Sequence, residues 1–372
     1  MKIKNRVYIT TTTSVSCAGK NNQVLFDKIL THSTGIQQDP NYFFNAKPAI
    51  GKLASKDTFY NELILQCQQV LEESDLQDFK ETLLIIGSSV GGMKKTEDIY
   101  IDTGDYENID PNKHHIQAIS NHLQCTFDFY DTLSFSTACT SSANALGYGY
   151  EVLAKGVYEN VLVVGADSLS QTTVGGFLTL GVLSSTPCKP FDLERDGMNV
   201  SEGIACLLLE TNPREGCIEL CGVGYSSDAY HMTHPHPTGQ GAIAAMSKAL
   251  KQANLLANDI DYINAHGTGT QANDSAEGNA IARLFPHKPF VSSTKSITGH
   301  TLGAAGALEA IISCMVIENQ TIPPNTFLEK KENININLPL EGCLYDIKYV
   351  MSNSFAFGGN NCSLIFGKVK HV

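Results

Sequence analysis

One cysteine stands in a setting that could make it a nucleophile. Cys139 lies within Ser134–Leu146, where small residues crowd it on both sides and an apolar helical pattern follows. The pattern predicts a tight strand-to-helix turn and a helix over Ala143–Lys155 that ends at Gly156. A thiol at a helix N-terminus feels the positive end of the helix dipole, which favours the thiolate. The alternative is a small buried cysteine that only packs a helix on a sheet.

Two histidines lie in stretches rich in glycine and small residues. His266 ends a strand pattern over 261–266 and precedes a Gly/Thr loop, which would present its imidazole to a cleft. Thr268 and Thr270 in this loop offer hydroxyl groups to a polar ligand arm. The second histidine, His300, stands just before a Gly/Ala-rich helix pattern. The alternative for His266 is an ordinary surface histidine.

Charged residues flank His300 on both sides along the chain. Lys295 precedes it by five residues, and Glu309 follows it by nine. A buried network of these three would orient the imidazole, and a nearby ammonium would favour its neutral form. The alternative is a capped helix with solvated charges. A fourth stretch, 353–361, is a Gly/Asn turn that could place a backbone N–H beside the thiol with Phe357 as a cover, or could be an ordinary hairpin.

Size and composition restrict the class of protein. The 372 residues carry a formal net charge of −12, only 17% are charged, and 31 are glycine, which is typical of a compact α/β enzyme. The acidic balance argues against nucleic acid and anionic membrane surfaces as partners. No apolar run reaches the roughly 18 residues of a membrane span. Eleven cysteines without paired CxxC spacing indicate reduced thiols, so we expect a cytoplasmic protein.

The hydrophobic pattern predicts two successive α/β halves, 1–225 and 226–372, with Cys139 in the first half and the two histidines and Lys295 in the second. The strands are predicted over 6–16, 83–89, 161–167, 204–210, 218–225, 261–266, 344–351 and 363–366. The helices are predicted over 21–30, 59–72, 143–155, 239–254 and 305–318. A β-rich segment is predicted over 125–130, and a polar, turn-rich surface excursion over 94–113.

The order of these motifs resembles that of the β-ketoacyl-[acyl carrier protein] synthases, condensing enzymes of the thiolase superfamily. The resembling segments are STACTSS, NAHGTGT, STKSITGHTLGAAGALEA and NSFAFGGNN. Each motif alone is weakly specific, but four in this order are highly specific, and the likeness covers nearly the whole chain. The resemblance implies a thiolase-like α/β fold, with duplicated halves in a layered α-β-α-β-α arrangement.

The resemblance also implies roles for individual residues. The family's condensing cysteine falls on Cys139, its two catalytic histidines on His266 and His300, and its lysine on Lys295. Its supporting glutamate falls on Glu309 and its gating phenylalanine on Phe357, whose N–H would form the oxyanion hole with that of Cys139. The chain departs from the family at 355–357, where Phe-Ala-Phe replaces Phe-Gly-Phe.

The implied reaction is a decarboxylative Claisen condensation. Malonyl carrier protein would lose CO₂ and attack an acyl group held on Cys139, in fatty-acid, polyketide or aryl-polyene chain elongation. Substrates would arrive on the phosphopantetheine arm of acyl carrier protein, with no bound cofactor or metal. A thiolase of the same fold is the alternative, with Cys362 near a glycine-rich turn as its second cysteine. Three histidines, His231, His234 and His236, suggest a zinc site, although the matching family loop borders the pantetheine tunnel.

The implied partners are acyl carrier protein and a second ketosynthase-like chain. The chain would form a homodimer, or be the catalytic subunit of a heterodimer with a chain-length partner, through a strand over 161–165. Because carrier proteins are acidic, docking needs a local positive patch on this acidic chain. Lys52, Lys56 and Lys189 are the predicted docking residues, and ordinary solvated lysines are the alternative.

Overall fold

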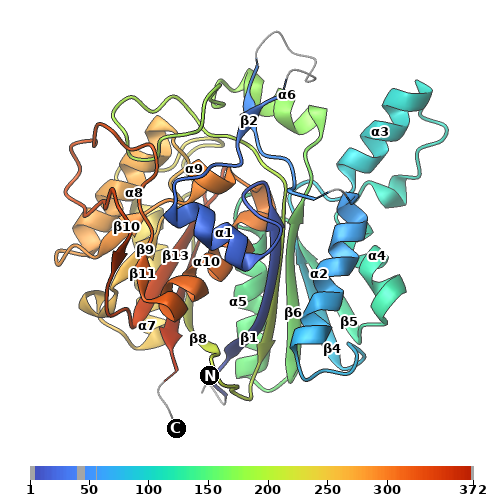
Figure 1. Ribbon diagram of the computed structural model, residues 1–372, viewed down its shortest axis with the longest axis horizontal. Helices are drawn as coiled ribbons and strands as arrows, with labels where there is room; N and C mark the ends of the chain where they lie inside the picture. Colours follow the sequence, from blue (N-terminus) through green and yellow to red (C-terminus); the bar gives the residue numbers. More distant parts are fainter. Residues whose placement is uncertain (1–4, 40–46, 56, 370–372) are drawn as a thin grey trace.

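A ten-stranded sheet runs through the whole molecule. The computed structural model describes residues 5–39, 47–55 and 57–369. The strand order is β10-β9-β13-β14-β8-β1-β7-β6-β4-β5, and Figure 1 shows the sheet covered by helices. The strands of this sheet are β1 (Tyr8–Ser16), β4 (Thr82–Gly87), β5 (Asp131–Phe135), β6 (Asn160–Asp167), β7 (Gly203–Glu210), β8 (Ile218–Ser227), β9 (Tyr262–Asn264), β10 (Phe290–Ser292), β13 (Tyr349–Phe355) and β14 (Asn360–Lys368).

The helices and minor strands fill the connections between these strands. The α-helices are α1 (Asn22–Leu30), α2 (Phe59–Glu73), α3 (Met93–Thr103), α4 (Gln117–Phe127), α5 (Ser141–Ala154), α6 (Gln171–Thr179), α7 (Gln240–Ala253), α8 (Gln271–Leu284), α9 (Lys295–Thr298) and α10 (Ala305–Asn319). The 3₁₀ turns are η1 (Pro111–Lys113), η2 (Ala257–Asp259) and η3 (Leu302–Ala304). Two small ribbons pair β2 (Gln37–Gln38) with β3 (Ala49–Ile50), and β11 (Thr321–Ile322) with β12 (Cys343–Leu344).

The sheet consists of two five-stranded halves with the same topology. In the first half β4 lies parallel to β5 and β6, and β7 lies antiparallel to β6 and β1. In the second half β9 lies parallel to β10 and β13, and β14 lies antiparallel to β13 and β8. The halves meet at a short pairing of β1 with β8. The duplicated α/β fold is thus confirmed, and by pairing the second half begins at β8, earlier than the predicted boundary after residue 225.

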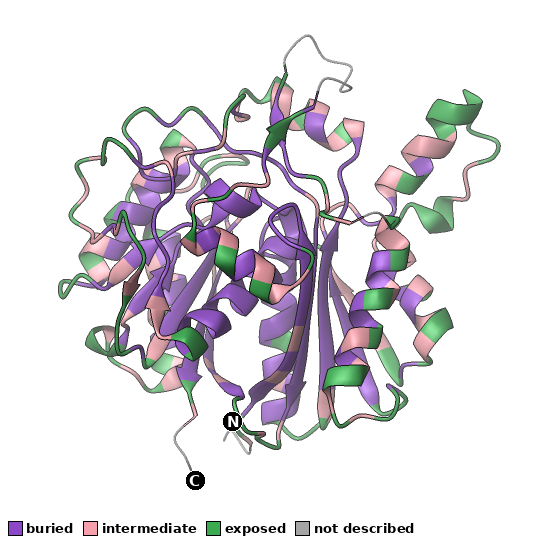
Figure 2. Ribbon diagram, in the orientation of Figure 1, coloured by how far each residue is buried: buried purple, intermediate pink, exposed green. Residues whose placement is uncertain are grey.

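Two central helices pack between the halves. Helix α5 contacts β6 and β14, and α10 contacts β13 and β7, so each helix touches strands of both halves. Helices α2 and α4 cover the outer side of the first half, and α7 and α8 cover the second (Figure 1). This gives the layered α-β-α-β-α arrangement. The central helices are almost wholly buried in Figure 2, which explains why α10 is apolar on every side.

The apolar character of α10 reflects its position in the core. The segment Leu302–Asn319 is long and apolar enough to cross a membrane by composition, but 89% of it is buried inside the protein. Small residues let α10 approach α5 closely: a Cβ added at Gly306 would lie 2.7 Å from the backbone nitrogen of Ala143. The segment that carries His300 is therefore fixed directly against the helix that follows Cys139.

Three sequence predictions are wrong in the first half. The segment 125–130 is not β-rich, because α4 continues to Phe127 and buries Leu123 one turn earlier. The stretch 94–113 is not only turns: α3 projects from the body in Figure 1, and only its Thr96 is buried, so it has no apolar stripe to reveal it. The strand over 161–165 is not at a boundary, since β6 lies buried between β7 and β4 and the edge strand of this half is β5.

Candidate active site

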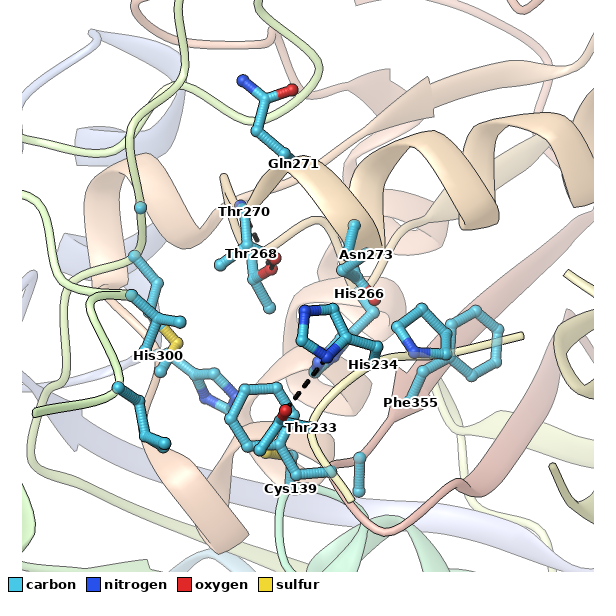
Figure 3. A pocket seen from close by; sticks show the side chains of 18 of the residues that line it. Cys139, Thr233, His234, His266, Thr268, Thr270, Gln271, Asn273, His300 and Phe355 are labelled. Atoms are coloured by element: carbon cyan, nitrogen blue, oxygen red, sulfur yellow. Dashed lines mark hydrogen bonds between the residues drawn. The ribbon is translucent and has the colours of Figure 1, made fainter. Parts of the chain in front are cut away.

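A cavity of about 330 Å³ opens between the loops at one end of the sheet, and both halves line it (Figure 3). Cys139 comes from the first half, and His266 and His300 come from the second. The wall also contains Phe177, Leu180, Val182, Met198, Thr233, His234, Thr268, Thr270, Gln271, Asn273, Phe355 and Phe357. The cavity therefore brings the thiol of the first half together with two imidazoles that lie far from it in the sequence.

The thiol stands on a strained turn between β5 and α5. Ala138 has φ +52°, a left-handed conformation that costs a non-glycine residue roughly 1–2 kcal/mol. The Ala138 carbonyl accepts hydrogen bonds from the Ser141 N–H at 3.0 Å and the Ser141 hydroxyl at 2.6 Å, which hold this conformation. Cys139 follows directly, is only 9% exposed, and lines the cavity.

A polar connection fixes the β13–β14 turn against the nucleophile turn. The Asn360 side-chain oxygen accepts from the Thr140 hydroxyl at 2.9 Å and from the Asn144 amide at 3.0 Å. This turn also carries the Phe357 N–H, which lowers the pKa of the Cys139 thiol in part. The half-buried Phe357 ring packs 6.2 Å from the ring of Phe177 across the cavity. Phe357 therefore lies where a cover over the thiol would stand.

Burial dominates the acidity of the thiol. Burial raises the pKa of Cys139 to about 11, while the Lys295 charge and the Phe357 N–H lower it in part. The sequence-based expectation of a thiolate stabilised by the helix dipole is therefore wrong for the resting site. Desolvation outweighs the dipole because the sulfur is enclosed by protein. Cys139 is a neutral thiol at pH 7.

A buried lysine organises His266. The Lys295 ammonium donates to the His266 carbonyl at 2.6 Å, lies 3.5 Å from His266 Nδ1, and forms an ion pair with Glu309. An ammonium group has no acceptor, so Nδ1 must be the acceptor and the imidazole proton belongs on Nε2. The Glu277 carboxylate holds the same loop, accepting from the N–H groups of His266 and Gly267 at 2.9 and 2.8 Å.

A strained turn fixes the tautomer of His300, as Lys295 fixes that of His266. The Leu302 N–H donates to His300 Nδ1 at 3.1 Å, and Leu302 has φ +54°. The imidazole proton of His300 therefore also belongs on Nε2. Within the described part of the chain, this buried Nε2 has no hydrogen-bond partner. Such a donor is suited to an acceptor atom that a ligand brings into the cavity.

Both imidazoles are neutral. Burial and then the charge of Lys295 hold the pKa of His266 and of His300 well below the ordinary value of 6.5, with a further contribution to His266 from His300. The two rings are 5.3 Å apart and nearly perpendicular. Burial raises the pKa of Glu309, and Lys295 opposes that shift. The result is a pair of neutral N–H donors beside a neutral thiol.

The other predicted residues fall into two groups. Thr268 and Thr270 line the cavity and share a hydrogen bond of 2.8 Å, drawn in Figure 3. The predicted docking lysines lie outside the cavity lining: Lys52 pairs with Asp39, and Lys189 lies 3.9 Å from Glu329. Lys56 lies outside the described residues. Neighbouring carboxylates thus partly offset the positive charges of Lys52 and Lys189.

Two groups of side chains include atoms of the kind that bind metal ions. The donor atoms of Cys139, His266 and His300 lie within 4.8 Å of one another, close enough for a metal ion. However, both Nδ1 atoms accept protein donors, so each Nε2 carries a proton instead of a free lone pair, and the nearby Lys295 charge repels a cation. His231 and His234 have their Nδ1 atoms 3.1 Å apart, whereas the Nδ1 of His236 accepts from the Thr238 N–H.

Sequence reasoning missed three residues that build the site. Asn360 connects the two turns, Glu277 holds the His266 loop, and Asp167 accepts hydrogen bonds from the turn after His300. Asn360 stands inside a motif that the sequence had singled out. No local pattern marks the other two, because their partners, 10 to 136 residues away along the chain, meet them only in the fold.

Comparison with known proteins identifies the family. Residues 27–214 match the family model described as Beta-ketoacyl synthase, N-terminal domain, and residues 217–329 match Beta-ketoacyl synthase, C-terminal domain. The chain belongs to the β-ketoacyl synthase family. It is 32% identical to 3-oxoacyl-[acyl-carrier-protein] synthase 2 of Coxiella burnetii, with 98% of this chain and 99% of the relative covered.

Solved β-ketoacyl synthase structures have the same fold. The ketosynthase ApeO, in complex with its chain length factor ApeC from Xenorhabdus doucetiae, has 31% identity and a TM-score of 0.89, with 98% of each chain covered. The ishigamide ketosynthase/chain length factor has 25% identity and a TM-score of 0.86, with 98% of this chain and 100% of that chain covered. The thiolase-like fold and the assignment to acyl-transferring condensing enzymes are therefore confirmed.

The acidity of Cys139 predicts how its reactivity depends on pH. Below its pKa of about 11, the thiolate fraction rises tenfold per pH unit. The rate of alkylation by iodoacetamide, measured by peptide mass spectrometry, should therefore rise about tenfold per unit from pH ~7 to ~9.5 without levelling. In urea-unfolded chain the same thiol should level off above pH ~9, near its ordinary pKa. A native rate that levels off near pH ~7.5 would mean a thiolate at rest.

Proposed function

We propose that this chain is a β-ketoacyl-[acyl carrier protein] synthase that condenses malonyl carrier protein with an acyl group held on Cys139. One observation carries this proposal above all: two neutral Nε2–H donors, those of His266 and His300, face a cavity that also contains a reactive thiol. Two such donors suit the oxygen of a thioester whose carbonyl becomes an enolate.

The first stage transfers the acyl group to the enzyme. The Cys139 sulfur attacks the thioester carbonyl of the acyl carrier protein, and a new S–C bond replaces the bond to the pantetheine sulfur. The thiol proton passes to the departing pantetheine sulfur, so the exchange is balanced. The N–H groups of Cys139 and Phe357 hold the oxyanion, and one such donor is worth about 3 kcal/mol. Attack begins from a thiol, because burial raises its pKa.

The second stage forms the carbon–carbon bond. His266 and His300 donate from Nε2 to the thioester oxygen of malonyl carrier protein. The carboxylate leaves as CO₂, and its electron pair becomes the enolate that the two donors stabilise. The enolate carbon attacks the acyl thioester on Cys139 and forms the new C–C bond as the C–S bond breaks. The sulfur leaves as a thiolate and takes up a proton from solvent water. Donors that stay neutral suit this step, because their protons remain on nitrogen.

The cavity is suited to a pantetheine arm. Thr268 and Thr270 present hydroxyl groups on its wall, and amide groups of the arm offer matching donors and acceptors. Substrates held on a carrier protein enter such a cavity without a resident cofactor, and the proposed steps use none. We also propose that Lys52, Lys56 and Lys189 contact the acyl carrier protein when it docks.

The thiolase alternative needs a second cysteine in the cavity. Cys362 lies in β14, is fully buried, and is not part of the cavity lining. Burial raises its pKa far above that of an ordinary thiol. The site of this chain therefore favours decarboxylative condensation over thiolase chemistry.

We also propose that the chain functions as a dimer in the cytoplasm. The edge strand β5 is half-exposed and flanked by Tyr130 and Tyr148, which are 71% and 37% exposed. An open strand edge beside aromatic rings is suited to pairing with a second chain. The structures of two similar ketosynthases include a chain length factor. The second chain is therefore either another copy of this chain or a partner of that kind. The eleven free cysteines support a reducing compartment.

Removing either imidazole tests the proposed reaction. His266→Ala and His300→Ala should each slow CO₂ release from malonyl carrier protein by about 10²-fold or more, because each removes one enolate donor. Acyl loading of Cys139, measured by intact mass, should persist in both variants. Cys139→Ala is the matched control, since it should abolish loading while the protein still folds. Wild-type CO₂ release in both histidine variants would refute the assignment.

The oligomeric state is tested by light scattering. The purified chain, of 40.3 kDa, should give about twice that mass at micromolar concentration, alone or after co-expression with a chain-length-factor homologue. A dimer that forms only after co-expression would identify the heterodimer. A monomer that condenses at full rate would contradict the proposed dimer.

A further inference from the structure

A buried carboxylate outside the cavity connects to both sides of the active site. Asp167 ends β6 and is fully buried. It accepts hydrogen bonds from the Ser88 hydroxyl and from three backbone N–H groups: Ser89 at 2.9 Å, Val90 at 3.0 Å and Gly303 at 2.6 Å. No ion pair to Asp167 occurs among the residues that the structure describes. Its charge is balanced by N–H and O–H donors alone.

One arm of this network leads to the thiol. Ser89, whose N–H Asp167 holds, donates from its hydroxyl to the Ala138 carbonyl at 3.0 Å. Ala138 is the strained residue, with φ +52°, directly before Cys139. The orientation of the thiol therefore depends on the turn that Asp167 binds.

The other arm leads to the histidine. Gly303, whose N–H donates to Asp167, follows Leu302, the second strained residue, with φ +54°. The Leu302 N–H donates to His300 Nδ1 and so keeps the proton on Nε2. Holding Gly303 therefore helps to fix the strained turn that sets the His300 tautomer.

The two arms pack closely against each other at Gly303. A Cβ added at Gly303 would lie 2.8 Å from an Asp167 oxygen and 2.6 Å from the Ser89 nitrogen. These three segments are thus packed in direct contact through a glycine. Burial raises the pKa of Asp167 to about 6, and its hydrogen-bond donors oppose that rise. The carboxyl group is therefore ionised at pH 7. An ionised carboxylate has acceptor oxygens for both arms, whereas a neutral amide has only one.

We propose that Asp167 is a positioning residue that sets the geometry of Cys139 and His300 together. Its effect on CO₂ release rests on the proposed function, but its effect on thiol reactivity does not. Asp167 touches no substrate, and it acts through Ser89 and Gly303.

Asp167→Asn tests the histidine arm. The amide oxygen should face the three donors of the Ser88–Val90 turn, which leaves the amide NH₂ against the Gly303 N–H. We expect CO₂ release from malonyl carrier protein to fall on the order of tenfold to hundredfold, with KM within about twofold. The matched control is Asp192→Asn, because Asp192 is equally buried and accepts three backbone N–H groups away from the two catalytic turns. It should lower the melting temperature without changing the rate.

Ser89→Ala tests the thiol arm without altering any charge. Alkylation of Cys139 by iodoacetamide should slow on the order of tenfold, because the Ala138 turn loses one of its holding bonds. This measurement needs no condensation activity, so it tests the thiol arm even if the proposed function is wrong. It also tests that arm if the Asp167→Asn variant does not fold. A rate within twofold of wild type in either variant would overturn the joint role. Equal losses in Asp192→Asn would also overturn it, by assigning the effect to general destabilisation.

Discussion

The buried ammonium group of Lys295 is the interaction on which the chemistry of the site depends. It is 1% exposed and bonded to the His266 carbonyl and the Glu309 carboxylate. A charge buried this deeply is tolerated only when its donors are satisfied. Burial first, and then the field of Lys295, keep both imidazoles neutral. The same field lowers the pKa of the Cys139 thiol in part, although burial dominates that thiol. One cation thus influences three reactive groups without touching a substrate.

The duplicated fold explains how these groups meet. Cys139 follows β5 in the first half, and His300 follows β10, the strand in the equivalent position of the second half. The loops that leave these strands converge at one end of the sheet, where the central helices α5 and α10 pack through small residues. A non-glycine residue with positive φ lies close to each reactive group: Ala138 directly precedes Cys139, and Leu302 lies two residues after His300. Backbone strain held by hydrogen bonds is therefore a shared device of both halves.

The sequence predicted much of this, and the failures have physical causes. Local patterns were sufficient for the helix after Cys139 and for the last strand, predicted over 363–366, because caps, glycines and apolar periods act over a few residues. The strand predicted over 344–351 is displaced, since β13 covers Tyr349–Phe355. The helix α3 was missed because it has almost no buried face to pattern. The predicted thiolate at Cys139 was wrong because desolvation of the sulfur depends on segments that are distant in the sequence and enclose it only in the fold. Asp167 and Glu277 were missed for the same reason, since their partners come together only in the fold.

Two neutral imidazoles, those of His266 and His300, present Nε2–H donors to the cavity beside the thiol. The most direct measurement is ¹⁵N NMR of histidine-labelled protein, with the resonances assigned by single substitutions. We expect His266 and His300 both to carry their proton on Nε2 and to stay neutral through pH ~6.5, where an ordinary imidazole takes up a proton. A proton on Nδ1 of either ring, or titration of either ring near pH ~6.5, would contradict this expectation.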